Sequence, residues 1–175
     1  MWRQFMVNKD QLPSNQIMLS TEMFNEISAV LKDLEGSIRA ELAIFCETSG
    51  IPITSTGNQR AIDISALSTL AAANFAATAE MARLLGEKDG FRFLFLEGER
   101  YNIYLCNVGF EYLLTIAISK SVALGMLRIY ANRAVKQLTE ILNKAKKQEK
   151  ASEAIFDSEF ADLLGNAFDA SFKKE

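Results

Sequence analysis

Few side chains in this sequence have the chemistry of a catalytic or metal-binding residue. The chain of 175 residues contains no histidine, which removes the commonest general base and the commonest transition-metal ligand. Its two cysteines, Cys46 and Cys106, stand in separate strand-like runs without CxxC spacing, so we expect buried, reduced thiols. No GxSxG, Walker lysine loop or GxGxxG lies between a strand and a helix. The sequence therefore predicts no cofactor, no metal site and no catalysis by the chain's own side chains.

The most distinctive stretch is 65–87, SALSTLAAANFAATAEMARLLGE, which predicts one long helix. An apolar stripe at helical spacing is expected to lie on a sheet: Leu67, Leu70, Ala71, Asn74, Thr78, Met81 and Leu85. The other side carries only short side chains, on a ridge of Thr69, Ala72, Ala73 and Ala76. Another protein's backbone could approach such a ridge closely. Alanine is also the best helix former, so the ridge could equally be plain helical surface.

Composition and charge narrow the class of protein. Hydrophobic residues make up 49% of the chain, enough for a core, and no apolar run approaches the roughly 20 residues that a membrane span needs. The formal charge of −3 argues against nucleic acid as a partner, because binding to phosphates needs clustered Lys and Arg. We therefore expect a soluble, cytoplasmic protein with no nucleic-acid partner and no membrane span.

The first half of the chain predicts a tail, a helix and a hairpin. Residues 1–19 lack a sustained period, and either Met1 or Met6 could be the natural start. Ser20 or Thr21 can cap a helix that runs to about Leu34 and stops at Gly36. Its inner face is expected to hold Phe24, Ile27, Val30, Leu31 and Leu34. Strands are predicted over 37–46 and 51–56, with Pro52 at a sheet edge or at a strand start.

The second half predicts a three-strand meander followed by helices. Strand runs cover 91–98, 101–109 and 112–119. The aromatic rings of Phe91, Phe93 and Phe95 share one face of the first run, where core packing is favoured over a dimer contact or a ligand site. A third helix is expected over 121–147, then a polar linker and an amphipathic helix within 154–172. That last helix could fold back on its own domain or dock on a partner.

The order helix, two strands, helix, three strands, helix predicts an α+β fold with a five-stranded antiparallel sheet. Together the hairpin ETSGIPITSTG, the helix LSTLAAANFAATAEMARLLGE, the strand pair FLEGERYNIYL and the segment YLLTIAISKSVALGMLRIYANRAVKQL resemble the roadblock/dynein light chain family. The acidic and apolar tail EAIFDSEFADLLGNAF narrows the resemblance to a bacterial gliding-motility branch. The resemblance implies a profilin-like fold with helices on both sheet faces, so the domains are expected at 1–19 (tail), 20–148 (roadblock domain) and 149–175 (linker and C-terminal helix).

The resemblance also implies what the protein binds. Family members form homodimers in which the third strand pairs with its copy, here through Phe91, Phe93, Phe95 and Glu97, and the Ala-rich helices of the two copies lie side by side. The gliding-motility branch binds a Ras-like small GTPase and accelerates hydrolysis by repositioning the GTPase's own groups, without an arginine finger. We expect the GTPase contact at Thr69, Ala72, Ala73 and Ala76, with a second contact through Phe160, Leu163, Leu164 and Phe168. Two other functions stay open, a roadblock scaffold that leaves hydrolysis unchanged and a small-molecule sensor.

Overall fold

The computed structural model describes residues 20–59, 62–88, 90–109 and 111–147. The chain divides into two units: one is Ser20–Lys144, and the other consists of the terminal segments Met1–Leu19 and Ala145–Glu175. The first unit contains all the strands described below. The expected N-terminal tail, linker and C-terminal helix fall outside the described residues, so these domain boundaries remain predictions.

Five strands form one antiparallel sheet in the order β2-β1-β5-β4-β3. They are β1 (Leu42–Glu47), β2 (Pro52–Gly57), β3 (Phe93–Glu97), β4 (Tyr101–Val108) and β5 (Tyr112–Ser119). The expected hairpin and meander are both present. The edges of the sheet are β2 and β3, and Pro52 begins the edge strand β2, where its missing N–H is tolerated. The predicted fold class is confirmed.

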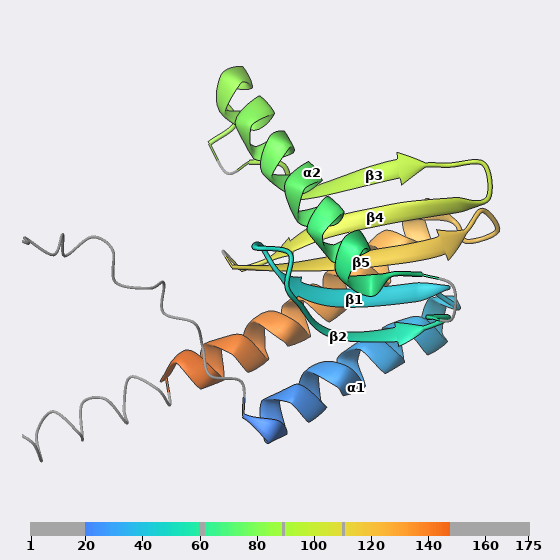
Figure 1. The fold of residues 1–175 in the computed structure, drawn as a ribbon, viewed down its shortest axis with the longest axis vertical. Helices are drawn as coiled ribbons and strands as arrows, with labels where there is room; N and C mark the ends of the chain where they lie inside the picture. Colours follow the sequence, from blue (N-terminus) through green and yellow to red (C-terminus); the bar gives the residue numbers. More distant parts are fainter. Residues whose placement is uncertain (1–19, 60–61, 89, 110, 148–175) are drawn as a thin grey trace, which may run out of the picture. The chain divides into compact units, whose positions relative to one another are not determined.

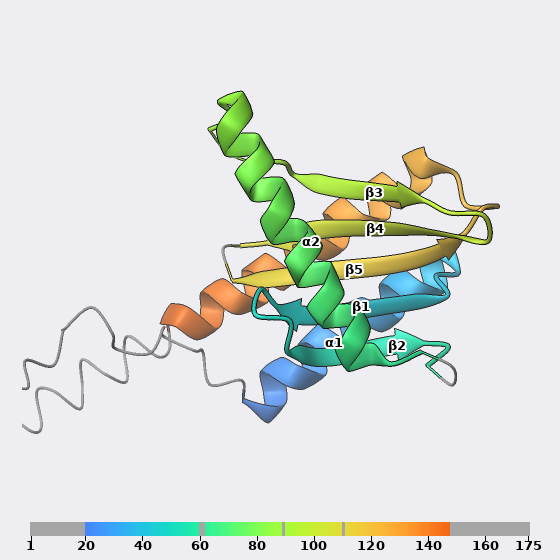
Figure 2. The ribbon, with the colours of Figure 1, turned by 45° about the horizontal axis from the view of Figure 1, so that its top comes forward.

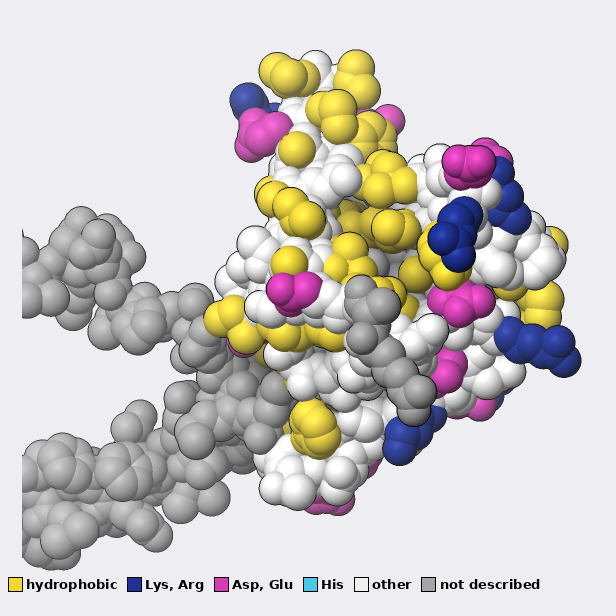
Figure 3. Space-filling model, turned by 45° about the vertical axis from the view of Figure 1, so that its right-hand side comes forward, with side chains coloured by type: hydrophobic (Ala, Val, Ile, Leu, Met, Phe, Trp, Pro, Cys, Tyr) yellow, Lys and Arg dark blue, Asp and Glu magenta, His cyan; other side chains and the backbone are white. Residues whose placement is uncertain are grey.

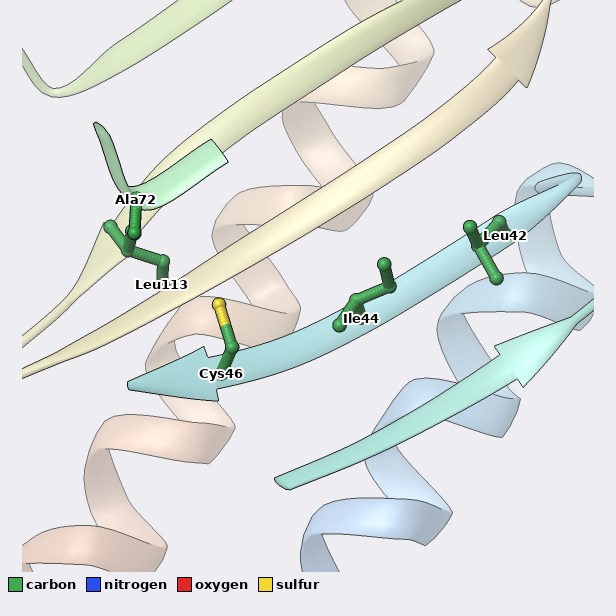
Figure 4. Packing of buried hydrophobic residues seen from close by; sticks show 5 residues of the cluster. All are labelled: Leu42, Ile44, Cys46, Ala72 and Leu113. Atoms are coloured by element: carbon green, nitrogen blue, oxygen red, sulfur yellow. The ribbon is translucent and has the colours of Figure 1, made fainter. Parts of the chain in front are cut away.

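Helices cover both faces of the sheet (Figure 1). One face is crossed by α2 (Ile64–Leu85), and the other carries α1 (Thr21–Ile38) together with the helix of residues 124–147, drawn in orange (Figures 1 and 2). Figure 4 shows a buried cluster between α2 and the sheet, made by Leu42, Ile44, Cys46, Ala72 and Leu113. The alternate residues Ala43 and Phe45 are fully buried as well. Burial on both faces explains why β1 is a continuous apolar run.

Helix α1 begins where its cap predicts and ends later than predicted. The Ser20 hydroxyl accepts a hydrogen bond from the Met23 N–H at 3.2 Å. The helix then runs through Gly36 to Ile38 and is capped by Arg39, which has a left-handed φ of 51°. An interior glycine costs only about 1 kcal/mol relative to alanine, so packing of the last turn through buried Ile38 overrides it. Phe24, expected inside, is exposed, and Met23 is buried instead.

Helix α2 (Ile64–Leu85) covers nearly all of the predicted stretch 65–87 but packs through a different face from the one predicted. Asp63 caps its first turn, accepting from the Ala66 N–H at 3.0 Å, and Gly86 ends it in the left-handed conformation. The buried residues are mostly small: Ser68, Ala71, Ala72, Thr78 and Ala82. Four residues of the expected sheet-facing stripe are exposed instead, namely Leu70, Asn74, Met81 and Leu85. Small side chains let the helix backbone approach the sheet closely. At this short distance the larger side chains do not fit between helix and sheet, so they lie at the side of the helix.

Gly50, in the turn between β1 and β2, sets how closely α2 can approach that turn. Its φ is 91°, and a Cβ at this position would lie 2.8 Å from the Thr69 Cα. We expect Gly50→Ala to lower the free energy of unfolding by about 2–5 kcal/mol, since a left-handed alanine costs roughly 1–2 kcal/mol and overpacking about 1–3 kcal/mol. Chemical denaturation measures this. Gly125→Ala is the matched control, because nothing lies within 4 Å of its Cβ position; a similar loss in both variants would contradict the close-approach argument.

Candidate protein interface

The predicted ridge of short side chains is exposed at three of its four positions. Thr69, Ala73 and Ala76 face outward from α2, and we call these three residues the outer ridge. The Thr69 hydroxyl donates to the Ser65 carbonyl at 2.9 Å, so its polar atom is turned back onto the helix. Ala72 was wrongly placed on this ridge, because it is buried against the sheet in the cluster of Figure 4. The outer ridge is thus a narrow line of short side chains.

Beside the outer ridge, α2 carries a line of larger apolar side chains. We call Leu67, Leu70, Met81 and Leu85 the apolar flank. Leu67 is half-buried, whereas Leu70 and Leu85 are 67% and 74% exposed and Met81 is exposed too. Figure 3 shows hydrophobic side chains gathered along α2 and in the hollow beside it. A contiguous exposed apolar surface of this kind often marks a site where another protein binds.

The sheet continues this apolar surface toward β3. Leu42 pairs with Ala117, Ala117 with Ile103, and Ile103 with Leu96, so these four residues share the face that α2 crosses. Leu96 and Tyr101 are exposed there. The C-terminal part of α2 projects past β3 (Figures 1 and 2). The loop that joins β3 to β4 lies at the other end of these strands, so α2 leaves the loop end of the β3–β4 hairpin uncovered.

A small cavity lies between the start of α2 and the sheet. Its volume is about 140 Å³, and it is lined by Glu41, Leu42, Asn58, Ile62, Leu67, Tyr101, Ile103 and Ala117. Most of these side chains are apolar. Pockets for drug-sized ligands measure roughly 300–1,000 Å³, so this cavity suits one side chain better than a small-molecule effector. The sequence gives no signal for Ile62 and Tyr101 as site residues: Ile62 lies in the loop just before α2, and only the fold brings Tyr101 of β4 beside Leu67.

The aromatic residues expected at a dimer contact lie partly inside the domain. The Phe93 ring stacks on Tyr104 with centroids 5.1 Å apart, and the Arg128 guanidinium lies 4.7 Å from the Phe93 centroid. Phe95 is half-buried, whereas Phe91 and Glu97 are exposed. The side chains of Phe93 and Phe95 therefore share the face opposite α2, and the backbone of β3 forms an edge of the sheet. The other predicted contact residues, Phe160, Leu163, Leu164 and Phe168, lie outside the described residues.

The titratable groups with shifted pKa values belong to the core rather than to this surface. Burial raises the pKa of the Cys46 thiol to about 11 and that of Cys106 to about 12. Burial also raises the pKa of Tyr104 to about 12. Both thiols are therefore protonated and poorly nucleophilic at neutral pH. Among the described residues, no three His, Cys, Asp or Glu side chains gather as metal ligands, and no helix is long and apolar enough to cross a membrane.

The free energy of unfolding is expected to fall above about pH 9. The thiols ionise near their ordinary pKa of 9.0 in the unfolded chain but only near 11 or 12 in the folded protein. Their stabilising contribution is thus complete below pH 9 and is lost as the pH rises toward the folded pKa, by up to about 1.4 kcal/mol per pH unit for each thiol. Denaturant titrations at about pH 8 and pH 10 measure the loss. Cys106→Ala should make it smaller, and an unchanged loss in that variant would contradict the assignment.

A sequence-family model identifies this arrangement. The model of the Roadblock/LC7 domain matches residues 27–117, more than half of the chain. The chain belongs to the Roadblock/LC7 family. The resemblance stated from the sequence is therefore confirmed, and the matched segment runs from within α1 to within β5. It includes the outer ridge, the apolar flank and the β3 edge of the roadblock domain.

Solved structures place the domain near one member of the family. MglB from Myxococcus xanthus is 30% identical with a TM-score of 0.70, over 74% of this chain and 96% of that one. A gliding protein MglB from Thermus thermophilus is 25% identical with a TM-score of 0.67, over 75% and 98%. A structure described as MglB with a tetrameric arrangement is also 25% identical, with a TM-score of 0.68 over 75% and 98%. No match was found among curated proteins.

Proposed function

We propose that this roadblock protein is a non-catalytic regulator of a Ras-like small GTPase. The observation that carries the proposal is the likeness to Myxococcus xanthus MglB, which is covered over 96% of its length at 30% identity. The resemblance to MglB implies a partner similar to the GTPase MglA, a cytoplasmic location and a role in cell polarity or gliding motility. The outer ridge of α2 supports the proposal, because a folded partner can pack tightly where side chains are short.

The proposed activity is GTPase activation without chemistry by this chain. In phosphoryl transfer most of the catalysis comes from positioning and from electrostatic stabilisation, so an activator can work by holding the GTPase's own groups in place. Several arginines of the regulator already have partners within the domain. Arg83 contacts Glu80 at 2.9 Å, Arg133 contacts Asp33 at 3.8 Å, and Arg128 lies over Phe93. Arg60 lies outside the described residues.

We further propose that the active form is a homodimer that pairs β3 with β3 of a second copy. The β3 backbone is a sheet edge, and the apolar flank and the uncovered β3–β4 hairpin lie on the same side of the domain. An unpaired strand edge beside exposed apolar side chains favours association. Light scattering at micromolar concentration should give twice the 19.5 kDa mass of one chain. A particle with the mass of a single chain would contradict the homodimer.

The test of the function is GTP hydrolysis by a purified MglA-like GTPase with and without this protein. Hydrolysis should accelerate, and alanine replacements at Arg60, Arg83, Arg128 and Arg133, made singly, should leave most of the stimulation intact. Loss of a true arginine finger costs about a thousandfold or more. A loss of that size from one replacement would overturn the repositioning mechanism. A stable complex with unchanged turnover would instead make this protein a scaffold.

A further inference from the structure

An open cleft lies where α1 ends and is larger than the cavity beside Leu67. The end of α1, the start of β1 and the end of β2 lie side by side here (Figures 1 and 2). The volume of the cleft is about 400 Å³, and its lining residues are Glu35, Gly36, Arg39, Ala40, Glu41 and Asn58. Ligand pockets measure roughly 300–1,000 Å³, so this cleft has room for a small molecule.

The charged side chains that line the cleft do not neutralise one another. Arg39, Glu41 and Asn58 make no side-chain hydrogen bond or ion pair with any other residue that the structure describes. Glu35 is held in place by the hydroxyl of Thr56, which donates to its carboxylate. The Arg39 guanidinium therefore lines the same cleft as two carboxylates without meeting either of them. Opposite charges arranged in this way leave room for a ligand that carries both.

The backbone of Arg39 has an unfavourable conformation. Its φ of 51° is left-handed, and no other residue except glycine has a positive φ in the described parts of the chain. Glycine is the usual residue at such a helix end, because a Cβ is disfavoured there. The N–H groups of Arg39 and Ala40 both donate to the Glu35 carbonyl, so the end of α1 imposes this conformation. Strained residues gather at ligand sites, and here the side chain of the strained residue lines a cleft.

The Glu41 side of the cleft is preformed. The Asn58 N–H donates to the Glu41 carbonyl at 2.7 Å. Gly57 has a φ of 102°, and a Cβ at this position would clash with the same carbonyl oxygen. Only glycine allows the end of β2 to lie so close to the residue before β1. A cleft held by such contacts needs little ordering when a ligand binds, which favours affinity.

The arrangement of charges defines the class of ligand. The carboxylates of Glu35 and Glu41 and the negative end of the α1 dipole attract a cationic group, and the last turn of α1 has no basic residue. The Arg39 guanidinium and the Asn58 amide can donate hydrogen bonds to a carboxylate. We propose that the cleft binds a small zwitterion, an α-amino acid with a free ammonium and a free carboxylate. This site is independent of the proposed GTPase contact and of the homodimer.

Titration calorimetry of the full-length protein with each of the common L-amino acids tests the proposal. At least one amino acid should bind. Its amide, which lacks the carboxylate, and its N-acetyl derivative, which lacks the ammonium, should each bind about tenfold more weakly or worse, since each loses hydrogen bonds to a charged group. If none of the amino acids binds, the proposal is wrong. An amide that binds as tightly as the amino acid would show that the cleft recognises only a cation, which also overturns the proposal.

Arg39→Gly tests the location of the site without the risk of unfolding. Glycine adopts a φ of 51° without strain, which offsets the greater entropy of its unfolded chain, so this variant should be about as stable as the wild-type protein. It should nevertheless bind the amino acid about tenfold more weakly, because it lacks the guanidinium. Glu41→Gln should weaken binding to a similar extent. Glu99→Gln is the matched control, since Glu99 is exposed between β3 and β4 and does not line the cleft. Unchanged binding in both cleft variants would overturn the site.

Discussion

Replacing Ala73 by arginine is expected to reduce affinity for the GTPase at least a hundredfold while leaving the protein folded and dimeric. Ala73 lies at the middle of the outer ridge and is exposed, and its neighbours Thr69 and Ala76 are short. A long charged side chain there would occupy the space proposed for the partner and would leave a charge desolvated if the complex formed. Arginine is a good helix former, so the substitution should lower the stability of α2 very little. Titration calorimetry with the GTPase measures the affinity.

The control for this change is Ala29→Arg, on α1. Ala29 is also an exposed helical alanine, but α1 covers the opposite face of the sheet (Figure 1). Affinity should be unchanged in that variant. The mass of each variant must be measured alongside, because a monomeric Ala73→Arg protein would place the outer ridge inside the homodimer. A dimeric variant with unchanged affinity would rule out the outer ridge as the GTPase contact.

The order and type of the elements could be predicted because local signals agree with the tertiary structure. The strand β5 has the predicted bounds, Tyr112–Ser119, since glycine and polar residues delimit a continuous apolar run. Asp63 and Gly86 mark the ends of α2 for the capping reasons available from sequence. The predicted end of α1 was wrong, because the burial of Ile38, a tertiary contact, outweighs the small loss of helix stability caused by Gly36.

The face of α2 could not be predicted, because hydrophobicity and closeness of approach compete on that helix. Periodicity placed Leu70 and Met81 on the sheet, yet the structure buries Ala72 and Ala82 instead. The sequence carries no signal that separates Ala72 from its neighbour Ala73, which is exposed. Only the position of the helix over β1 and β5 decides which alanine is covered. The cavity depends in the same way on tertiary structure, because strand register joins its lining residues Leu42, Ala117 and Ile103, which lie far apart in the chain.

Leu70→Asp is expected to convert the homodimer into a monomer with a mass near 19.5 kDa. Leu70 is 67% exposed on the apolar flank, so an aspartate there is solvated in the isolated domain. In a two-fold interface the substitution occurs twice, and each carboxylate would be buried against an apolar side chain of the second copy, with nothing to pair it. The dissociation constant should rise at least a hundredfold, as measured by sedimentation equilibrium.

Ile129→Asp separates this effect from a general effect of surface charge. Ile129 is 69% exposed on the helix of residues 124–147, so the two substitutions remove similar exposed side chains from opposite faces of the sheet. The Ile129 variant should remain dimeric. If the GTPase contacts both copies, the monomeric Leu70 variant should also lose stimulation of hydrolysis although its outer ridge is intact, whereas Ala73→Arg should lose stimulation as a dimer. Equal dissociation in the Leu70 and Ile129 variants would show that the apolar flank is not the dimer contact.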